Sequence, residues 1–305
     1  MAFLRGFGAF LPERIVTSEE IAARIGTTPK WIQEVSGIEE RRWAAPDVTV
    51  TDLAVRAAED CLMRSGVAAS EIGMIIVASG SSERRFPGPA SVVGQRLGLN
   101  SVPAIDLPMA SAGSLYGMAL ASRLVDGIGN VLVVGAEKMS SVVDRDPADP
   151  NTAILFGDGA GACIVSADQG RLRIIDSVLH SDGAFAEDLR LGFDGVLEMH
   201  GMAVILQASR KIPGAINELL SKHLIAAANV ERFVMHQANQ NLIVRVAKSV
   251  GVPAESFYSN IAKYGNTSSA SMLIAASECW MDARSICFAA FGAGFHWGAL
   301  LAAES

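Results

Sequence analysis

Three polar residues follow apolar segments and carry groups that acyl chemistry uses: Ser111, His236 and Asn266. Ser111 stands between a predicted strand and a predicted helix. Backbone N–H groups and the positive end of the helix dipole favour negative charge at such a junction, so its hydroxyl is a candidate nucleophile. Serine is also among the preferred residues for capping a helix. Ser111 taken alone therefore leaves a catalytic and a structural role open.

The same ambiguity applies to the other two residues. His236 follows the apolar run Arg232–Met235, and a histidine there can act as a base or as a hydrogen-bond donor. It can equally be a structural residue, as can the four other histidines. Asn266 lies in a Tyr-Gly-Asn-Thr sequence that is typical of a turn, and its amide can also donate to an oxyanion. The three residues form a site only if the fold brings them together.

The elements that would position these residues alternate between helix and strand in the first half. Threonine caps followed by acidic residues or proline predict helices that begin after Thr17 and Thr28. Further helices are predicted over residues 51–66, 89–97 and 113–126, and strands over residues 72–79, 102–107 and 131–136. Strands that alternate with helices predict an α/β fold with a mainly parallel sheet covered on both faces.

The second half repeats landmarks of the first half in the same order. Residues 74–79 match residues 232–237, residues 111–114 match residues 267–270, and residues 156–159 match residues 291–294. Three matches in one order favour a duplication. We predict two halves, residues 1–168 with Ser111 and residues 169–305 with His236 and Asn266. Matched elements of two such halves can meet around a shared axis and build one site.

Composition narrows the classes of function. The net charge of −7 and the lack of a basic cluster argue against nucleic acid as a partner. No apolar run approaches the ~20 residues of a membrane-spanning helix, so no membrane association is expected, and the start of the chain does not read as a signal peptide. The four cysteines are widely spaced without a CxxC pattern, so we expect no zinc, disulfide or redox site and a cytoplasmic location.

Five segments taken together resemble the β-ketoacyl-acyl-carrier-protein synthase III enzymes of the thiolase superfamily. They are residues 106–113, 156–162, 236–239, 265–268 and 291–298, in the order and spacing of that family. The resemblance extends over essentially the whole chain. It implies a thiolase-like five-layered αβαβα fold, a homodimer, and a Cys-His-Asn site that takes an acyl group from coenzyme A and condenses it with malonyl-carrier protein. It implies no metal and no bound cofactor, because the acyl-CoA or phosphopantetheinyl carrier is a substrate.

The resemblance also assigns roles to individual residues. The family's histidine and asparagine fall on His236 and Asn266, whereas its nucleophilic cysteine falls on Ser111. A cysteine is partly thiolate near neutral pH, whereas a serine hydroxyl needs a base within reach, which His236 can supply. The oxyanion hole would be formed by the N–H groups of Ser111 and Ala293. Positions that line the family's acyl pocket fall on Phe86, Phe156, Leu189, Met199 and Phe291, although apolar residues are equally typical of a core.

The serine at position 111 admits three explanations. It can be a natural variant that handles starter units, an engineered substitution that traps an acyl complex, or a sign of a non-catalytic partner of a cysteine-bearing paralogue. Retention of His236 and Asn266 favours an active site. Because an oxygen ester is less activated than a thioester, acyl transfer to an oxygen or nitrogen acceptor without condensation is the alternative reaction.

A second departure from the family concerns the acyl donor. Two arginines that grip coenzyme A in the family fall on Val35 and Pro150, while the stacking tryptophan is kept as Trp31. Losing both cations removes charge-assisted contacts to the nucleotide, which Arg41 or Arg42 would replace only in part. The loss favours an acyl-carrier protein over coenzyme A as the donor.

The surface that would receive this carrier also differs from the family pattern. The family's carrier-docking arginine falls on Asn241, which has no charge. Other cations in the same part of the sequence are candidate contacts for an acidic carrier: Arg210, Lys211, Arg245 and Lys248.

Overall fold

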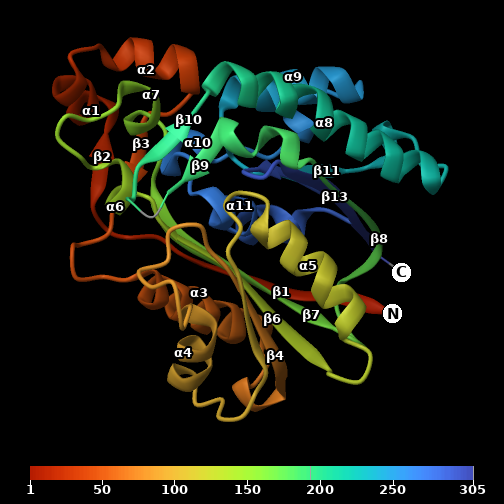
Figure 1. Cartoon of the computed structure of the whole chain (residues 1–305). Coiled ribbons are helices and arrows are strands. Elements are labelled where there is room, and N and C mark those ends of the chain that lie inside the picture. Colours follow the sequence, from red (N-terminus) through yellow and green to blue (C-terminus); the bar gives the residue numbers. More distant parts are fainter. Residues whose placement is uncertain (193, 305) are drawn as a thin grey trace.

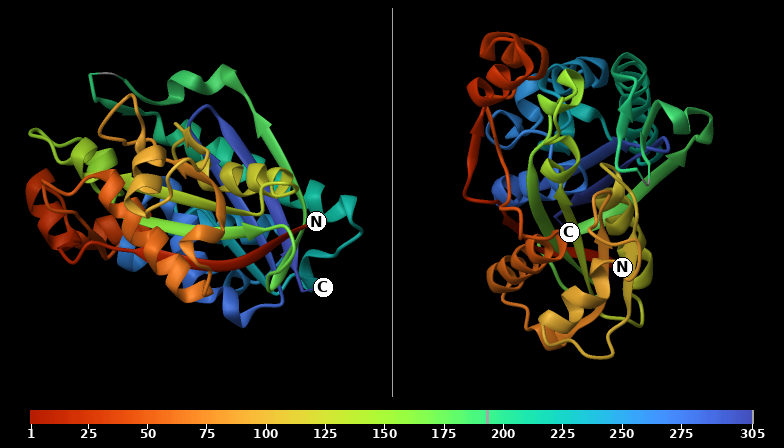
Figure 2. Two further views of the ribbon diagram at one scale, coloured as in Figure 1. Left: turned by 90° about the horizontal axis from the view of Figure 1, so that it is seen from below. Right: turned by 60° about the vertical axis from the view of Figure 1, so that its left-hand side comes forward.

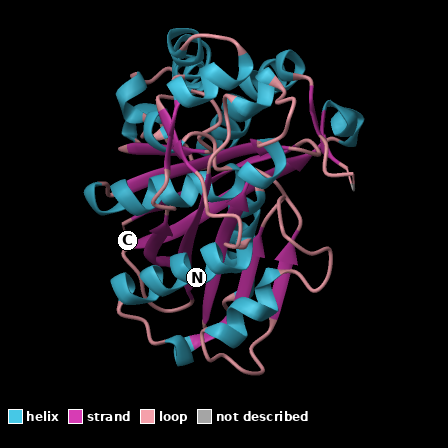
Figure 3. Cartoon of the chain, turned by 90° about the vertical axis from the view of Figure 1, so that its left-hand side faces the viewer, coloured by secondary structure: helices cyan, strands magenta, loops and turns pink. Residues whose placement is uncertain are grey.

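The computed structural model describes residues 1–192 and 194–304, which form five alternating layers of helices and strands (Figure 1). One outer layer holds α3 (Val50–Ser65) and α4 (Pro89–Arg96), and the other holds α8 (Gly201–Lys222) and α9 (Gln240–Val250). The central layer holds α5 (Gly113–Leu124) and α11 (Ser271–Cys279). Strands lie between these helical layers, as Figure 3 shows from another side. This is the αβαβα arrangement that the family resemblance implies.

The two strand layers are continuous through one pair of strands. The full order is β11-β12-β13-β8-β1-β7-β6-β4-β5, and β1 joins β8 through the pairs Ala2–Ile174, Phe3–Arg173 and Leu4–Leu172. Figure 2 shows the chain termini near each other at this junction. The strands of the first half are β1 (Ala2–Phe10), β4 (Ile72–Ala78), β5 (Ala104–Leu107), β6 (Asn130–Lys138) and β7 (Asp158–Ser166). Those of the second half are β8 (Leu172–Ser181), β11 (Arg232–Met235), β12 (Ser285–Gly292) and β13 (His296–Ala303).

The prediction of a mainly parallel sheet is wrong. Among the described strands, the parallel neighbours are β4–β5, β4–β6 and β11–β12. The other neighbours, β1–β7, β1–β8, β6–β7, β12–β13 and β8–β13, are antiparallel. A strand buried on both faces is apolar throughout whichever way its neighbour runs. The apolar pattern therefore predicts the strands but not their direction.

The strand order repeats between the halves. The series β11-β12-β13-β8 follows the same pattern of directions as β4-β6-β7-β1. The counterpart of β5 in the second half is reduced to an isolated parallel bridge between Phe233 and Phe257. The division that we propose near residue 168 falls in the connection between β7 and β8.

Local sequence signals account for the helices that surround the site. Thr17 caps α1 (Ser18–Ile25) and Thr28 caps α2 (Pro29–Ser36), as predicted, and each helix ends at a glycine in the left-handed region, with φ of 69° and 77°.

The remaining α-helices and β-strands of the described residues are short: β2 (Ile15–Thr17), β3 (Glu40–Arg42), α6 (Ser140–Val143), α7 (Pro150–Ala153), β9 (Leu189–Leu191), β10 (Leu197–Met199) and α10 (Ile261–Tyr264).

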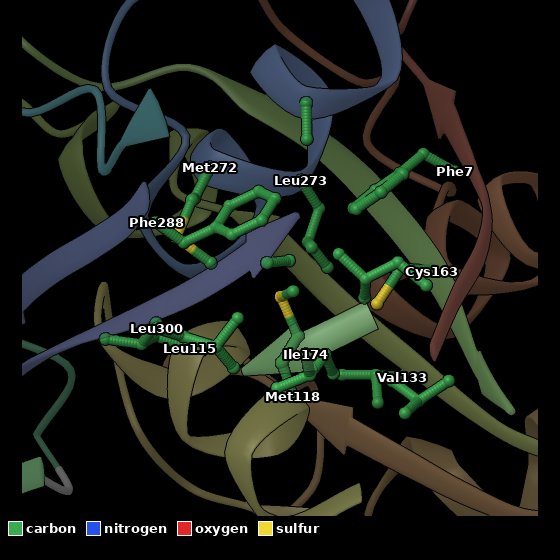
Figure 4. Packing of buried hydrophobic residues seen from close by; sticks show 14 of the residues in the cluster. Phe7, Leu115, Met118, Val133, Cys163, Ile174, Met272, Leu273, Phe288 and Leu300 are labelled. Carbon is green, nitrogen blue, oxygen red and sulfur yellow. The ribbon is translucent and has the colours of Figure 1, made fainter. Parts of the chain in front are cut away.

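The central core is shared by both halves (Figure 4). Leu115 and Met118 of α5 and Met272 and Leu273 of α11 pack in one cluster with strand residues from both layers. Because α5 and α11 lie between two strand layers, both are buried on most sides, which explains their apolar composition. Outer helices such as α9 bury one face only. The two helices that follow Ser111 and Asn266 thus lie within the core.

Membrane-spanning helices and the state of the cysteines are the two features on which the composition led to expectations. None of the helices within residues 1–192 and 194–304 is long and apolar enough to cross a membrane. The four cysteines, Cys61, Cys163, Cys279 and Cys287, are free thiols buried in the core.

Candidate active site

Ser111 occupies a strained backbone position directly before the N-terminus of α5. Its φ is 62°, in a region that non-glycine residues rarely adopt, and its side chain is buried. Its N–H donates to the Ser268 hydroxyl at 3.0 Å. A Cβ at Gly292 would lie 2.8 Å from the Ser111 Cβ and 2.4 Å from the Ala110 carbonyl oxygen, so β12 passes this turn closely because it ends in glycine. The turn is therefore held from the second half of the chain.

His236 directly follows β11 and continues its pairing, since its N–H donates to the Ala289 carbonyl at 2.9 Å. Its Nδ1 lies 2.6 Å from the hydroxyl of Ser271, the first residue of α11. Burial lowers the pKa of His236 to about 4, because a charged imidazole would be desolvated there. The ring is therefore neutral at neutral pH and can accept a proton.

Asn266 is fixed through its backbone and through one end of its amide. Its N–H donates to the Leu155 carbonyl at 2.9 Å, and its carbonyl accepts from Gly157 N–H at 3.1 Å. Its Oδ1 accepts from Ser268 N–H at 2.9 Å. The Nδ2 amide is consequently the end that remains to donate to another group.

These three buried residues line one cavity of about 90 Å³. Most of its other walls are apolar, and they include Phe156, Leu189, Met199 and Phe291. Within the described residues, Ser111 Oγ and Asn266 Nδ2 have no hydrogen-bond partner in the protein. A hydroxyl, a basic nitrogen and an amide donor in one apolar cavity are the groups that acyl transfer needs.

Two predicted contacts do not line this cavity, and one predicted donor already has a partner. Trp31 lies partly exposed on α2, and Phe86 is 86% exposed on the segment before α4. Neither is a wall of the cavity in a single chain. The N–H of Ser111, one of the two predicted oxyanion donors, is bonded to Ser268. Ala293 follows Gly292, which is a cavity residue, but does not itself line the cavity. The predicted oxyanion hole is therefore not open in this conformation.

Arg41 cannot replace the missing coenzyme A contacts, and that expectation is wrong. The side chain is fully buried, and its guanidinium donates to the Ile154 carbonyl at 2.7 Å and to the Ser18 hydroxyl at 3.3 Å. Burial lowers the pKa of Arg41 to about 10. Arg42 is paired with Glu40 at 3.3 Å. Both arginines stabilise the fold around β3.

The candidate docking cations divide into two groups. Arg210, Arg245 and Lys248 are exposed on α8 and α9. Lys211 is instead held within the protein, 3.3 Å from Asp182 and 3.9 Å from the centre of the Trp297 ring. Lys211 is therefore not available to a partner.

Two neutral side chains hold α2 against the start of α9. Asn239 and Asn241 both donate from Nδ2 to the carbonyl of Val35, at 2.8 and 3.3 Å, and Asn241 also donates to the Glu34 carbonyl at 3.0 Å. The residue that falls on the family's docking arginine thus closes the C-terminal end of α2.

Sequence reasoning missed two residues at the site, Ser268 and Ser271. Ser268 lies in segments that served as a landmark of the duplication and of the family resemblance, without a role of its own, and Ser271 lies just beyond them. Ser268 contacts the backbone of Ser111, and Ser271 contacts the ring of His236. A serine that contacts a catalytic candidate and a serine that caps a helix look alike in sequence. Within the described residues, no group of three or more His, Cys, Asp or Glu side chains is arranged to hold a metal ion.

Comparison with known proteins identifies related sequences. The family model "3-Oxoacyl-[acyl-carrier-protein (ACP)] synthase III" matches residues 105–183, and the model of its C-terminal part matches residues 220–303. The β-ketoacyl-[acyl-carrier-protein] synthase III of Staphylococcus saprophyticus is 35% identical over 305 residues, which cover 97% of each chain.

Solved structures agree with these matches. The crystal structure of 3-oxoacyl-[acyl-carrier-protein] synthase III from Aquifex aeolicus is 33% identical, with a TM-score of 0.95 and coverage of 100% of both chains. The priming β-ketosynthase of the R1128 polyketide biosynthetic pathway is 28% identical, with a TM-score of 0.91 and coverage of 100% of this chain and 97% of the other. The similarity therefore includes both strand layers and all three helical layers.

Proposed function

The chain belongs to the 3-oxoacyl-[acyl-carrier-protein] synthase III family, and from this premise we propose that it is an acyltransferase that loads an acyl group onto Ser111 and condenses it with a malonyl-carrier thioester. Such a reaction would supply a starter unit for fatty-acid or polyketide synthesis. The observation that carries the proposal is the meeting of Ser111, His236 and Asn266, from both halves, at one mainly apolar cavity.

In the loading step, Ser111 Oγ attacks the thioester carbonyl while its proton passes to His236 Nε2. The carbon–sulfur bond then breaks, and the same proton leaves Nε2 for the departing sulfur, so the products are a serine ester and a thiol. His236 is available to accept this proton because burial lowers its pKa to about 4, so the ring is neutral at neutral pH. The negative charge on the carbonyl oxygen needs N–H donors, and those of Ser111 and Ala293 are the candidates. Ser268 must release Ser111 N–H for this step.

In the condensing step, the malonyl carboxylate leaves as carbon dioxide and the remaining enolate attacks the ester on Ser111. The carbon–oxygen bond of the ester breaks, and the serine oxygen takes a proton from water. Asn266 Nδ2 has no protein partner among the described residues, which supports a role as donor to the enolate oxygen. The product is a β-keto thioester on the carrier.

Acyl transfer to an oxygen or nitrogen acceptor is the second candidate. It is favoured by the serine itself, because an oxygen ester reacts less readily with a carbanion than a thioester does. The two reactions differ in their products: condensation releases carbon dioxide and forms a ketone, whereas simple transfer does neither.

We propose that an acyl-carrier protein is the preferred donor. The support is electrostatic, because the positions that match the family's two coenzyme A-binding arginines are the uncharged Val35 and Pro150. Arg41 cannot replace them, since its side chain is buried. Arg210, Arg245 and Lys248 remain exposed on α8 and α9, whose faces supply walls of the cavity such as Val204 and Leu242. Their cations would attract an acidic carrier to the surface nearest the cavity.

We also propose that two copies of the chain form a homodimer. Strand β5 lies at the end of the strand order, and its Ile105 is 40% exposed. The outer edge of such a strand has no neighbour within the described chain, and an exposed apolar residue there suits it to pairing with another chain. Phe86, which the resemblance assigns to the acyl pocket, is 86% exposed in the single chain, so it would have to line the pocket of the second copy.

Intact mass spectrometry tests the proposed function. The protein would be incubated with matched panels of acyl-CoA and acyl-carrier thioesters, and malonyl-carrier protein would then be added. We expect a mass increase of one acyl group, followed by its loss together with release of carbon dioxide and formation of a β-keto thioester. Loading without ketone formation would favour simple transfer, and no loading from any donor would favour a non-catalytic partner.

A further inference from the structure

Ser271 makes three polar contacts through one hydroxyl oxygen at the start of α11. Its Oγ lies 2.6 Å from His236 Nδ1, accepts from Gln237 N–H at 3.1 Å, and lies 2.9 Å from the Ser268 carbonyl oxygen. The side chain is buried, so water does not satisfy these groups in its place. The arrangement of hydrogens among these contacts determines which nitrogen of His236 carries a proton.

A hydroxyl has a single hydrogen, and a carbonyl oxygen can only accept. If the Ser271 hydrogen points to the Ser268 carbonyl, Nδ1–H of His236 donates to Ser271, and each of the three contacts contains one hydrogen. If it points to Nδ1 instead, the Ser271 and Ser268 oxygens face each other at 2.9 Å without a hydrogen between them. Two buried acceptors in that position repel each other, so the first arrangement is the stable one.

We propose that Ser271 is a positioning residue that holds His236 in the Nδ1–H tautomer and so directs the free electron pair of Nε2 into the cavity. A neutral imidazole carries one proton, so protonation of Nδ1 leaves Nε2 as the acceptor. Ser271 thereby makes His236 a base toward Ser111, and it leaves Asn266 as the side chain that donates to an enolate. The role as a base rests on the proposed function, whereas the tautomer does not.

The tautomer can be measured in the unmodified protein without substrate. Protein labelled with ¹⁵N in histidine would be examined by two-bond ¹H–¹⁵N correlation NMR, and the His236 signals would be assigned by their loss in His236→Gln. We expect the Nδ1 signal of a protonated nitrogen and the Nε2 signal of an unprotonated one. A protonated Nε2 in the wild-type protein would overturn the proposal, whether or not the enzyme is active.

A matched pair of variants tests the role of Ser271 itself. Ser271→Ala should populate the Nε2–H tautomer and slow acylation by ~10- to 100-fold, the order expected when the hydrogen-bond partner that orients a functional histidine is lost. Ser269→Ala is the control, because Ser269 is also fully buried but its hydroxyl donates to the Ala78 carbonyl at 3.0 Å and not to His236. An unchanged tautomer in Ser271→Ala would refute the proposal. Should that variant not fold, the spectrum of the wild-type protein alone decides.

Discussion

Two junctions that lead into a helix meet at the site, one from each half, and their serines have different tasks. Ser111 leads into α5 with φ of 62°, and Ser268 leads toward α11 with φ of 47°, so both adopt a conformation that is rare without glycine. Both side chains are buried. The Ser111 hydroxyl has no protein partner among the described residues and borders the cavity, whereas the Ser268 hydroxyl accepts the N–H of Ser111.

The difference shows how a duplicated fold can build a single site. Strained backbone costs about 1–3 kcal/mol per residue and persists only where neighbouring structure enforces it. Here each junction holds the other, since Ser268 accepts from Ser111 and the Ser114 hydroxyl donates to the Ser269 carbonyl at 2.7 Å. One copy of the junction therefore presents a reactive group, and the other copy supports it.

The largest expected effect separates the two serines. Ser111→Ala should abolish thiol release from acyl donors and leave the melting temperature nearly unchanged, because the lost hydroxyl has no protein partner among the described residues. Ser268→Ala should retain measurable thiol release but lower the free energy of unfolding by about 1–3 kcal/mol, since it leaves the buried N–H of Ser111 without an acceptor. Thiol-release kinetics measure the acylation activity of each variant, and denaturant unfolding measures its free energy of unfolding. Equal phenotypes for the two variants would contradict the division of tasks.

The next largest loss of activity is expected from substitution of His236 or Asn266. His236→Ala should slow acylation by ~100- to 10,000-fold, as expected for loss of an acid–base group. Asn266→Ala should reduce malonyl decarboxylation more than acylation, because its amide is assigned to the enolate oxygen. Thiol release measures acylation and carbon dioxide release measures decarboxylation in each variant. Melting temperatures serve as the control for folding. Full activity with much earlier melting would make the two residues structural.

The pH dependence of acylation should show how completely His236 is buried. Its pKa is about 4, lowered from 6.5 by desolvation, so kcat/KM should begin to fall only as pH approaches 4. A fall centred near 6.5 would contradict a buried neutral base.

Stability gives an independent check of the same pKa. Between pH 6.5 and 4 the unfolded state binds a proton at His236 that the folded state does not, so this residue lowers stability as pH falls through that range. The wild-type protein should therefore lose more stability than His236→Gln between these two pH values. Parallel losses in both proteins would place the pKa of His236 near its ordinary value.

The smallest expected effect concerns the donor. Carrier-bound acyl groups should give a higher specificity constant than coenzyme A esters of the same acyl group, because the matched arginine positions are Val35 and Pro150. Arg245→Ala should lower the constant for carrier donors and leave that for coenzyme A donors unchanged. A higher specificity constant for the coenzyme A donor would contradict the proposed preference for a carrier protein.

The sequence predicted the local structure and much of the site, but not what depends on distant contacts. Threonine caps predicted where α1 and α2 begin, since the capping signal is local. Matching landmarks in the two halves, together with the family resemblance, brought Ser111, His236 and Asn266 to one site. The direction of the strands, the burial of Arg41 and the exposure of Phe86 were not predictable, because each depends on which elements become neighbours.

The central claim is that the two halves build one acyl-accepting site around the Ser111 hydroxyl. Its most direct test is peptide mapping by mass spectrometry after acid quenching of the protein with an acyl-carrier donor. We predict a single acyl group, bound as an oxygen ester on the peptide that contains Ser111 and absent from Ser111→Ala. An acyl group on any other residue, or one that persists in the alanine variant, would contradict the account.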